Sequence, residues 1–285
     1  MKTKATGTRA DISAKVNISA VYRGYFSNPK TARAFCNIGI KPILSKLPKS
    51  IKYSDFGGGD GYLGKFVNDY LKKNGKKVNA IIVDANQKFL KKAKKLGLKT
   101  KLANLQDVKA KNFDLITMRA VLHYQNLEEQ LKIMKTAYKN LKKGGYLIHQ
   151  LSTGEKRECD LRTAIVNLSS LRKLSEGDYL WITKEQYIKL CKKAGFSEIG
   201  FVGDAPPHSW GPEEQWDRFN SAKRAEALAK GNIKEVEKID KRKKKYFADT
   251  QKLLKMKKFK GAIIEKTQTG SYVVPYEYAI ILARK

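Results

Sequence analysis

The sequence predicts an α/β fold of the doubly wound type, in which helices cover both faces of a parallel sheet. Three observations support this prediction. Short apolar runs alternate with helical patterns from Ile51 onward, 41% of the 285 residues are hydrophobic, and a glycine-rich turn separates the first expected strand from the helix that follows it. A chain of this length can bury a sizeable core as one domain with an elaboration.

Two helices are expected before the first strand. Residues 1–20 are polar and small, and apolar residues at helical spacing occupy 31–47, with an interruption at Pro42. These helices either pack on the core or form a lid over the glycine turn. In the second case, Tyr22 and Tyr25 face the ligand.

Strands and helices alternate regularly between residues 51 and 151. The expected strands are 51–55, 78–84, 100–103, 113–118 and 146–151, and the expected helices are 62–73, 87–96 and 127–141. Right-handed crossovers place the carboxyl ends of all parallel strands on one rim of the sheet, where ligands bind. A further helix is expected at 161–174, from apolar residues at helical spacing.

The turn after the first strand reads D-x-G-x-G-x-G, from Asp55 to Gly61. Glycine reaches positive φ without a Cβ penalty and lets a ligand approach the backbone, and the next helix offers unpaired N–H groups at its start. Asp84 ends the second strand, where an acid can bind a ribose diol. Dinucleotide enzymes and adenosyl-cofactor enzymes both need such an acid, but the acid before the glycines favours the second class.

In these motifs the chain resembles the class I S-adenosylmethionine-dependent methyltransferases. Five segments match in order: Asp55 to Gly61, Asp84, residues 103–108, residues 113–124 and residues 142–147. The resemblance covers residues 20–203 and the last strand. It implies a seven-stranded, mostly parallel, Rossmann-like sheet, whose last strand is antiparallel and lies between strands five and six.

The resemblance also implies S-adenosylmethionine as the cofactor and a set of residues that bind it. These residues are Asp55, Gly57, Gly59, Gly61, Asp84, Ala85, Asn104, Leu105 and Arg119. Asn104 departs from the pattern because many relatives have Asp there. An amide oxygen can still accept a hydrogen bond from the adenine amino group, so the expected contact is weaker and is not lost.

Four regions follow from this assignment. They are an N-terminal arm with lid helices at 1–50, a cofactor-binding core with strands one to six at 51–203, a basic helical insertion or substrate cap at 204–270, and the last strand at 271–285. Residues 183–196, a helix followed by Ala-Gly-Phe, look like an element of small-molecule methyltransferases related to the quinone-biosynthesis enzymes. Strand six is then expected at 198–202, a rigid loop at 205–212 and strand seven at 276–283.

Candidate catalytic residues follow the fourth strand. His123 lies at the ligand rim and titrates near neutrality, so it is a candidate base for an acceptor that carries a proton at pH 7. Alternatively, it only fixes the loop. Arg119 and Tyr124 are candidates for orienting an anionic or aromatic substrate. The weaker candidates for substrate contacts are His149 and Gln150, at the end of strand five, and His208 beside Trp210.

The chain is strongly basic, with a formal net charge of +32. Residues 223–260 alone hold fifteen Lys and Arg against five Asp and Glu, and their apolar residues recur at helical spacing. One or two long helices are therefore expected there. They either form a solvated cap over the substrate side or attract a polyanion such as RNA.

Three functions remain open from the sequence: a small-molecule methyltransferase, which we favour, an RNA or protein methyltransferase, and a non-catalytic partner protein. Against nucleic-acid methylation, no N/D-P-P-Y/F motif follows strand four and no Pro-Cys pair occurs. The three cysteines and three histidines lack metal-ligand spacing. Neither a signal peptide nor a membrane span is recognisable, so a soluble cytoplasmic protein is expected.

Overall fold

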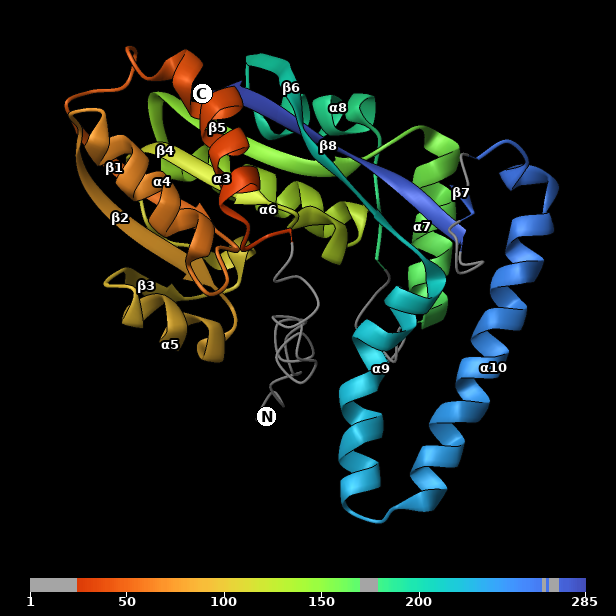
Figure 1. The fold of residues 1–285 in the computed structure, drawn as a ribbon. Helices are drawn as coiled ribbons and strands as arrows, with labels where there is room; N and C mark the ends of the chain where they lie inside the picture. Colours follow the sequence, from red (N-terminus) through yellow and green to blue (C-terminus); the bar gives the residue numbers. More distant parts are fainter. Residues whose placement is uncertain (1–24, 170–178, 263–264, 267–271) are drawn as a thin grey trace, which may run out of the picture.

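A computed structural model describes residues 25–169, 179–262, 265–266 and 272–285. Seven strands form one sheet in the order β3-β2-β1-β4-β5-β8-β6 (Figure 1). The strands are β1 (Ser50–Phe56), β2 (Lys77–Asp84), β3 (Lys99–Leu102), β4 (Phe113–Arg119), β5 (Leu141–Thr153), β6 (Glu198–Trp210) and β8 (Tyr272–Arg284). β8 is antiparallel to β5 and β6, and the first five strands are parallel. The expected seven-stranded, mostly parallel sheet is confirmed.

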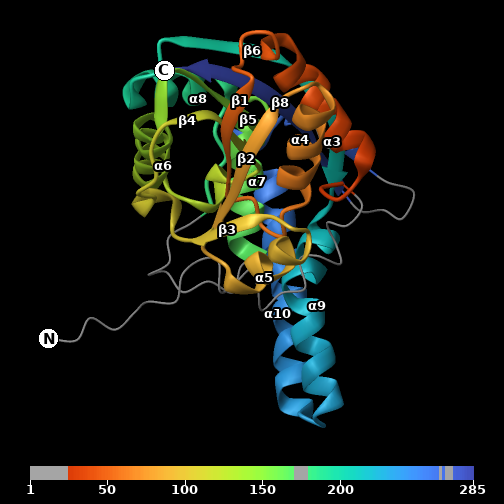
Figure 2. The ribbon, with the colours of Figure 1, turned by 90° about the vertical axis from the view of Figure 1, so that its left-hand side faces the viewer.

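Helices cover both faces of this sheet (Figure 2). On one face lie α3 (Pro29–Phe35) and α4 (Tyr62–Lys73), and on the other lie α6 (Leu127–Asn140) and α8 (Lys184–Ala194). α5 (Gln87–Lys95) packs on β2 and β3. Each face buries its own apolar cluster, and the side chains of a strand alternate between the two clusters.

The region before β1 differs from the two expected helices in its described part. α3 continues directly into a π-helical turn, Cys36–Ile40, and a 3₁₀ turn, Lys41–Ile43, which contains Pro42. A Cβ atom on Gly39 would lie 2.7 Å from Ile148 Cγ2, so the absence of a side chain lets this segment pack closely on β5. The expected helix around Tyr22 lies outside the described residues.

Three of the helices between β5 and β8 in the sequence form a helical cap. α7 (Lys156–Ser169) packs against α9 (Pro212–Ala229) and α10 (Ile233–Lys255), and the short 3₁₀ turn Lys257–Phe259 follows. α9 and α10 form an antiparallel hairpin that projects beyond the sheet (Figures 1 and 2). This confirms the expected helical insertion before the last strand. Among the described residues, no helix is both long enough and apolar enough to cross a membrane.

The expected rigid loop at 205–212 is wrong. β6 continues through this segment to Trp210, and β8 begins at Tyr272, so the two strands pair over a greater length than expected. The register shifts between Ala205 and His208, where Pro206 and Pro207 stand. Proline has no amide to donate to the ladder, and such an irregularity accommodates it. The antiparallel β7 (Glu265–Lys266) adds two more residue pairs to β8.

Candidate cofactor and acceptor site

The glycine turn between β1 and α4 contains two positions with a positive φ, which residues with a side chain rarely adopt. Gly57 has a φ of 70°, and a Cβ there would lie 2.6 Å from Val121 Cγ2. Gly59 has a φ of 55°, and no atom lies within 4 Å of its Cβ position. The backbone at Gly59 therefore faces open space that a ligand can approach.

Asp84, at the end of β2, is tied to this turn. Its carboxylate accepts hydrogen bonds from the amide of Gly59, over 2.9 Å, and from that of Asn86, over 2.8 Å. The side chain is partly exposed. Burial raises the pKa of Asp84, although these backbone hydrogen bonds act against the shift. Ala85 follows it directly and is half-buried.

The backbone of Asp84 also anchors the segment that follows β3. Its carbonyl accepts a hydrogen bond of 3.1 Å from the amide of Ala103. Asn104 is exposed, and Leu105 is buried in the next turn. The structure therefore brings three sequence motifs, at the ends of β1, β2 and β3, to one corner of the rim.

Asp55, near the end of β1, is almost fully buried. Thr117 donates a hydrogen bond of 2.7 Å to Asp55 Oδ1, and Tyr53 Oη lies 2.7 Å from Thr117 Oγ1. Asp55 Oδ2 has no hydrogen-bond partner among the described residues. Burial raises the pKa of Asp55 to about 7, even though the hydrogen bond from Thr117 and the charge of Arg119 lower it.

Arg119 ends β4 on the same side of the sheet. Its Nη2 donates a hydrogen bond of 2.6 Å to the carbonyl of Phe26, and its guanidinium carbon lies 5.2 Å from the centre of the Phe26 ring. Nη1 is buried and has no hydrogen-bond partner in the part of the chain that the structure describes. Burial lowers the pKa of Arg119, and the carboxylate of Asp55 opposes this shift.

These groups fit S-adenosylmethionine. Asp55 Oδ2 is an unused buried acceptor suited to an ammonium, and Arg119 Nη1 is an unused buried donor suited to a carboxylate. The cofactor carries both groups at its methionine end. The open backbone at Gly59 and the partly exposed carboxylate of Asp84 suit its ribose.

The chain turns sharply after Arg119. Ala120 has a φ of 53°, in the left-handed region that non-glycine residues rarely adopt, and its amide donates a hydrogen bond of 3.0 Å to the carbonyl of Gln150. The following 3₁₀ turn, Leu122–Tyr124, carries two of the candidate catalytic residues.

His123 lies in a stack of aromatic rings. Its ring centre is 4.7 Å from that of Trp181, with nearly parallel planes, and 4.3 Å from that of Tyr124. Tyr179 lies 5.6 Å from Tyr124 and 5.9 Å from Trp181. Tyr179 and Trp181 were not among the predicted site residues, although a Tyr-Leu-Trp triplet just before a capped helix was a signal for them.

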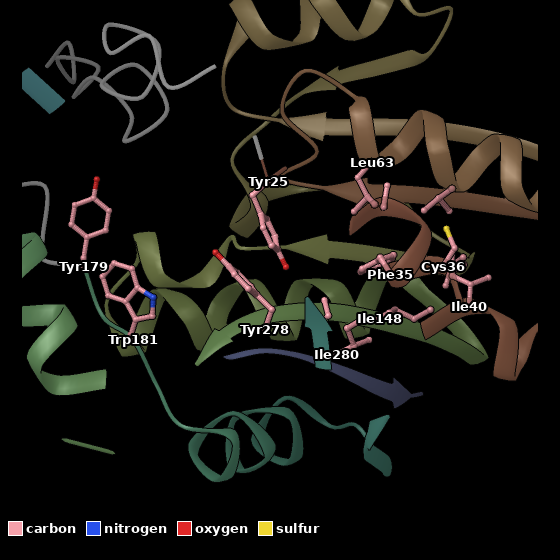
Figure 3. Packing of buried hydrophobic residues seen from close by; sticks show 14 of the residues in the cluster. Tyr25, Phe35, Cys36, Ile40, Leu63, Ile148, Tyr179, Trp181, Tyr278 and Ile280 are labelled. Carbon is pink, nitrogen blue, oxygen red and sulfur yellow. The ribbon is translucent and has the colours of Figure 1, made fainter. Parts of the chain in front are cut away.

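A second aromatic group lies on the same side of the sheet (Figure 3). Tyr25 stacks on Tyr278 of β8 with ring centres 4.6 Å apart. Its hydroxyl donates to the carbonyl of Pro206 over 2.6 Å and accepts from Gln150 Nε2 over 3.1 Å. Tyr25 is therefore held firmly beside Arg119 and Phe26, as a wall of the site.

One remaining candidate lies elsewhere, and the structure does not describe the side chains of three others. His149 is fully buried on the opposite face of the sheet, next to Tyr187 of α8, and burial lowers its pKa to about 3. The backbone of His208 and Trp210 belongs to β6, and their side chains lie outside the description. Tyr22 also lies outside the described residues.

Asp114, in the matched motif at 113–124, has a structural role that was not predicted. It accepts a hydrogen bond of 2.8 Å from the amide of Lys52 and pairs with Lys142. The motif thereby joins β1, β4 and the start of β5, and it contributes to the site only by holding these strands in place.

Comparison with known proteins supports the same assignment. A family model described as "Methyltransferase domain" matches residues 30–199. No curated protein matches the sequence. A putative methyltransferase from Bacillus halodurans is similar in structure, with 16% identity and a TM-score of 0.62 over 89% of this chain and 98% of that one.

Two other solved structures share the fold at low identity. One is a Haemonchus contortus phosphoethanolamine N-methyltransferase in complex with phosphomonomethylethanolamine and S-adenosylhomocysteine, at 13% identity and a TM-score of 0.54, over 100% of this chain and 62% of that one. The other is a putative sarcosine dimethylglycine methyltransferase from Galdieria sulphuraria. It has 11% sequence identity and a TM-score of 0.52, over 96% of this chain and 98% of that one. With the matched family model and the geometry at β1, β2 and β4, these findings show that the chain belongs to the class I S-adenosylmethionine-dependent methyltransferases.

Proposed function

We propose that this enzyme methylates a small molecule. One observation carries the proposal: the acceptor side of the rim is walled by buried or half-buried aromatic rings from separate segments of the chain. Tyr25 and Tyr278 form one wall, and the stack that contains His123 and Trp181 forms the other. Such apolar, aromatic surroundings suit a compact acceptor better than a polymer chain.

Bound S-adenosylmethionine supplies an electrophilic methyl group, which an acceptor takes by in-line displacement. The contribution of the chain is to hold the two reactants in line and to exclude water. Tyr25 is suited to the first task because hydrogen bonds to Pro206 and Gln150 fix its ring. The aromatic walls serve the second.

We further propose that His123 accepts the proton of the acceptor when the acceptor is protonated at pH 7. Its ring stacks on Trp181 and contacts Tyr124, and these contacts hold the plane of the imidazole in one orientation. Arg119 would act on the cofactor side, since its guanidinium lies next to Asp55. Tyr124 would line the acceptor.

The acceptor class is a narrower proposal. Aromatic walls favour either a cationic amine, through cation–π attraction, or a planar ring such as a quinol. The phosphoethanolamine N-methyltransferase and the putative sarcosine dimethylglycine methyltransferase, both named for amines, support the first choice. The Ala-Gly-Phe element after α8, which resembles the quinone-biosynthesis enzymes, supports the second.

The test is release of S-adenosylhomocysteine by the purified protein with a panel that contains phosphomonomethylethanolamine, sarcosine, a soluble quinol and unstructured RNA. We expect turnover with a small molecule and none that depends on RNA. Turnover that needs RNA and that no small molecule of the panel supports would replace this proposal with RNA methylation. An Asp84→Ala variant, in which cofactor binding should be weakened, serves as the control.

A further inference from the structure

Basic charge is concentrated in one half of the α9–α10 hairpin. Residues 223–241 contain six Lys and Arg against four Asp and Glu, whereas residues 242–260 contain nine against one. The second group occupies the half of α10 that lies away from the hairpin tip, and the 3₁₀ turn after it. The excess charge is therefore local, and it lies near the body of the protein.

Three acids close to this basic half are already used in ion pairs. Asp240 forms a two-fold contact with Arg224, at 2.7 and 2.8 Å, and Asp217 pairs with Lys243 at 3.1 Å. Asp249 is shared by Lys245 and Lys252. Eight basic residues of 223–260 form no ion pair with any residue that the structure describes: Lys234, Lys241, Arg242, Lys244, Lys255, Lys257, Lys258 and Lys260.

Most of these residues point into solvent along one path. Lys241, Lys244 and Lys255 are exposed on α10, while Val236, Ile239 and Tyr246 form its buried face. From residue 241 to residue 255 the helix rises about 21 Å. The path then turns with the backbone to Lys257, Lys258 and Lys260, which are exposed as well.

We propose that this basic face, defined by Lys241, Lys244, Lys255, Lys257 and Lys260, binds single-stranded RNA through its phosphates. Unpaired cations at intervals along a surface release counterions from a polyanion, and this release favours binding. A single strand is flexible enough to follow the turn from α10 to Lys260, whereas a rigid duplex would contact only the straight part.

An anionic membrane fits this face less well. An interfacial helix buries large apolar side chains in the lipid boundary, but the apolar stripe of α10 is packed against α7 and α9. Between residues 241 and 260, Met256 is the single exposed large apolar residue among those described. The face therefore offers charge with almost no apolar surface to insert.

The basic face is also separated from the methyl-transfer site. α10 packs mainly against α7 and α9, and it lies on the outer side of the cap (Figure 1). The bound RNA is therefore a partner that holds the enzyme, and it is not the acceptor. This inference is independent of the proposed small-molecule activity.

A charge-matched pair of variants tests it. In the first, Lys241, Lys244, Lys255 and Lys257 are changed to Gln. In the second, Lys91, Lys92, Lys94 and Lys95, four exposed residues of α5 that form no ion pair among the described residues, are changed to Gln. Both variants lose the same charge, and circular dichroism with thermal melting checks that both fold. Anisotropy of a labelled oligouridine of about 20 nucleotides then gives the affinity between about 50 and 200 mM salt.

We expect the α10 variant to bind RNA at least tenfold more weakly than the wild type at about 100 mM salt. The slope of log K against log salt should also become shallower by about 3, since four phosphate contacts are lost and each contributes about 0.7. The α5 variant should stay within about threefold of the wild type. Equal losses in the two variants would overturn the proposal, because general charge would then account for binding. Tighter binding to duplex DNA, or binding to phosphatidylserine vesicles without binding to RNA, would overturn it too.

Discussion

Thr117 donates a hydrogen bond of 2.7 Å to Asp55, from β4 to the neighbouring strand β1, in a site that excludes solvent. The other oxygen of this carboxylate has no hydrogen-bond partner among the described residues. A buried carboxylate with one satisfied oxygen is costly to ionise, and burial raises its pKa to about 7. An incoming ammonium group would supply the missing partner. The stability of the protein without cofactor and its affinity for the cofactor should therefore depend on pH in opposite directions.

The first prediction concerns stability without the cofactor. The pKa of Asp55 is raised from its ordinary value of 3.8 to about 7, so the folded state holds the proton more tightly than the unfolded state. The stability that this group contributes is therefore fully present below pH 4 and is lost as the pH rises toward 7. The free energy of unfolding falls by about 4 kcal/mol at most over this range. Asp55→Asn should melt at a higher temperature than the wild type at pH 8 and should remove this pH-dependent component. A lower melting temperature for the variant at pH 8 would contradict the assigned pKa.

The second prediction concerns binding. Because the ammonium of the cofactor pairs with the ionised carboxylate, affinity for S-adenosylhomocysteine should fall as the pH drops below about 7, approaching tenfold per pH unit. Calorimetric titrations at several pH values measure this slope. Asp55→Asn should bind weakly at every pH and show a flat profile. If the variant keeps the slope of the wild type, another group is responsible.

The third prediction concerns the hydrogen bond itself. Thr117→Val removes the donor to Asp55 and the hydrogen-bond partner of Tyr53, so the pKa of Asp55 should rise further. The midpoint of the pH profile for S-adenosylhomocysteine binding should shift upward. Thr117→Ser keeps the hydroxyl and should leave the midpoint close to that of the wild type. Equal midpoints in all three proteins would show that this hydrogen bond does not control the acid.

The fourth prediction separates the role of His123 from its packing. For an acceptor that is protonated at pH 7, His123→Asn should lower kcat by about 10²–10⁴-fold. Affinity for S-adenosylhomocysteine should not change, because the imidazole stacks on Trp181 and is not among the groups proposed to bind the cofactor. Trp181→Phe keeps an aromatic neighbour and should cost much less in kcat. If the two variants lose the same activity, His123 serves only to pack the loop.

The fifth prediction concerns the α9–α10 hairpin. Tyr246 is buried at its base, where its ring lies 5.2 Å from that of Trp216 and its hydroxyl donates to the carbonyl of Pro212. Tyr246→Ala should lower the free energy of unfolding by about 3 kcal/mol. Arg224→Ala removes an exposed ion pair with Asp240 and should leave the melting temperature nearly unchanged. Urea unfolding measures both, and comparable losses would contradict this ranking.

Much of the core could be predicted from the sequence, because local patterns determine it. The glycine turn needs positive φ at Gly57 and Gly59, and Asp84 stands where a strand of the expected length ends. Both signals lie within a few residues of the structure that they specify. The order of the strands followed from the family resemblance together with the alternation of strands and helices.

Other features depend on contacts between distant segments and were missed. The extension of β6 through Pro206 needs β8 as its partner, and no local pattern in the sequence reveals that pairing. His149 lies on the face of β5 that α8 covers, away from the site, because a shift of one position along a strand exchanges the two faces. The contact of Trp181 with His123 joins residues 58 positions apart.

The central claim is that the ends of β1, β2 and β4 bind S-adenosylmethionine, and a calorimetric titration of S-adenosylhomocysteine tests it most directly. Asp84 is the residue to change, since its carboxylate both fixes Gly59 and faces the open backbone. We predict saturable binding to the wild type and a loss of about 10- to 100-fold in Asp84→Ala, the size expected for charged hydrogen bonds. Absence of binding to the wild type, or unchanged affinity in Asp84→Ala, would contradict the account.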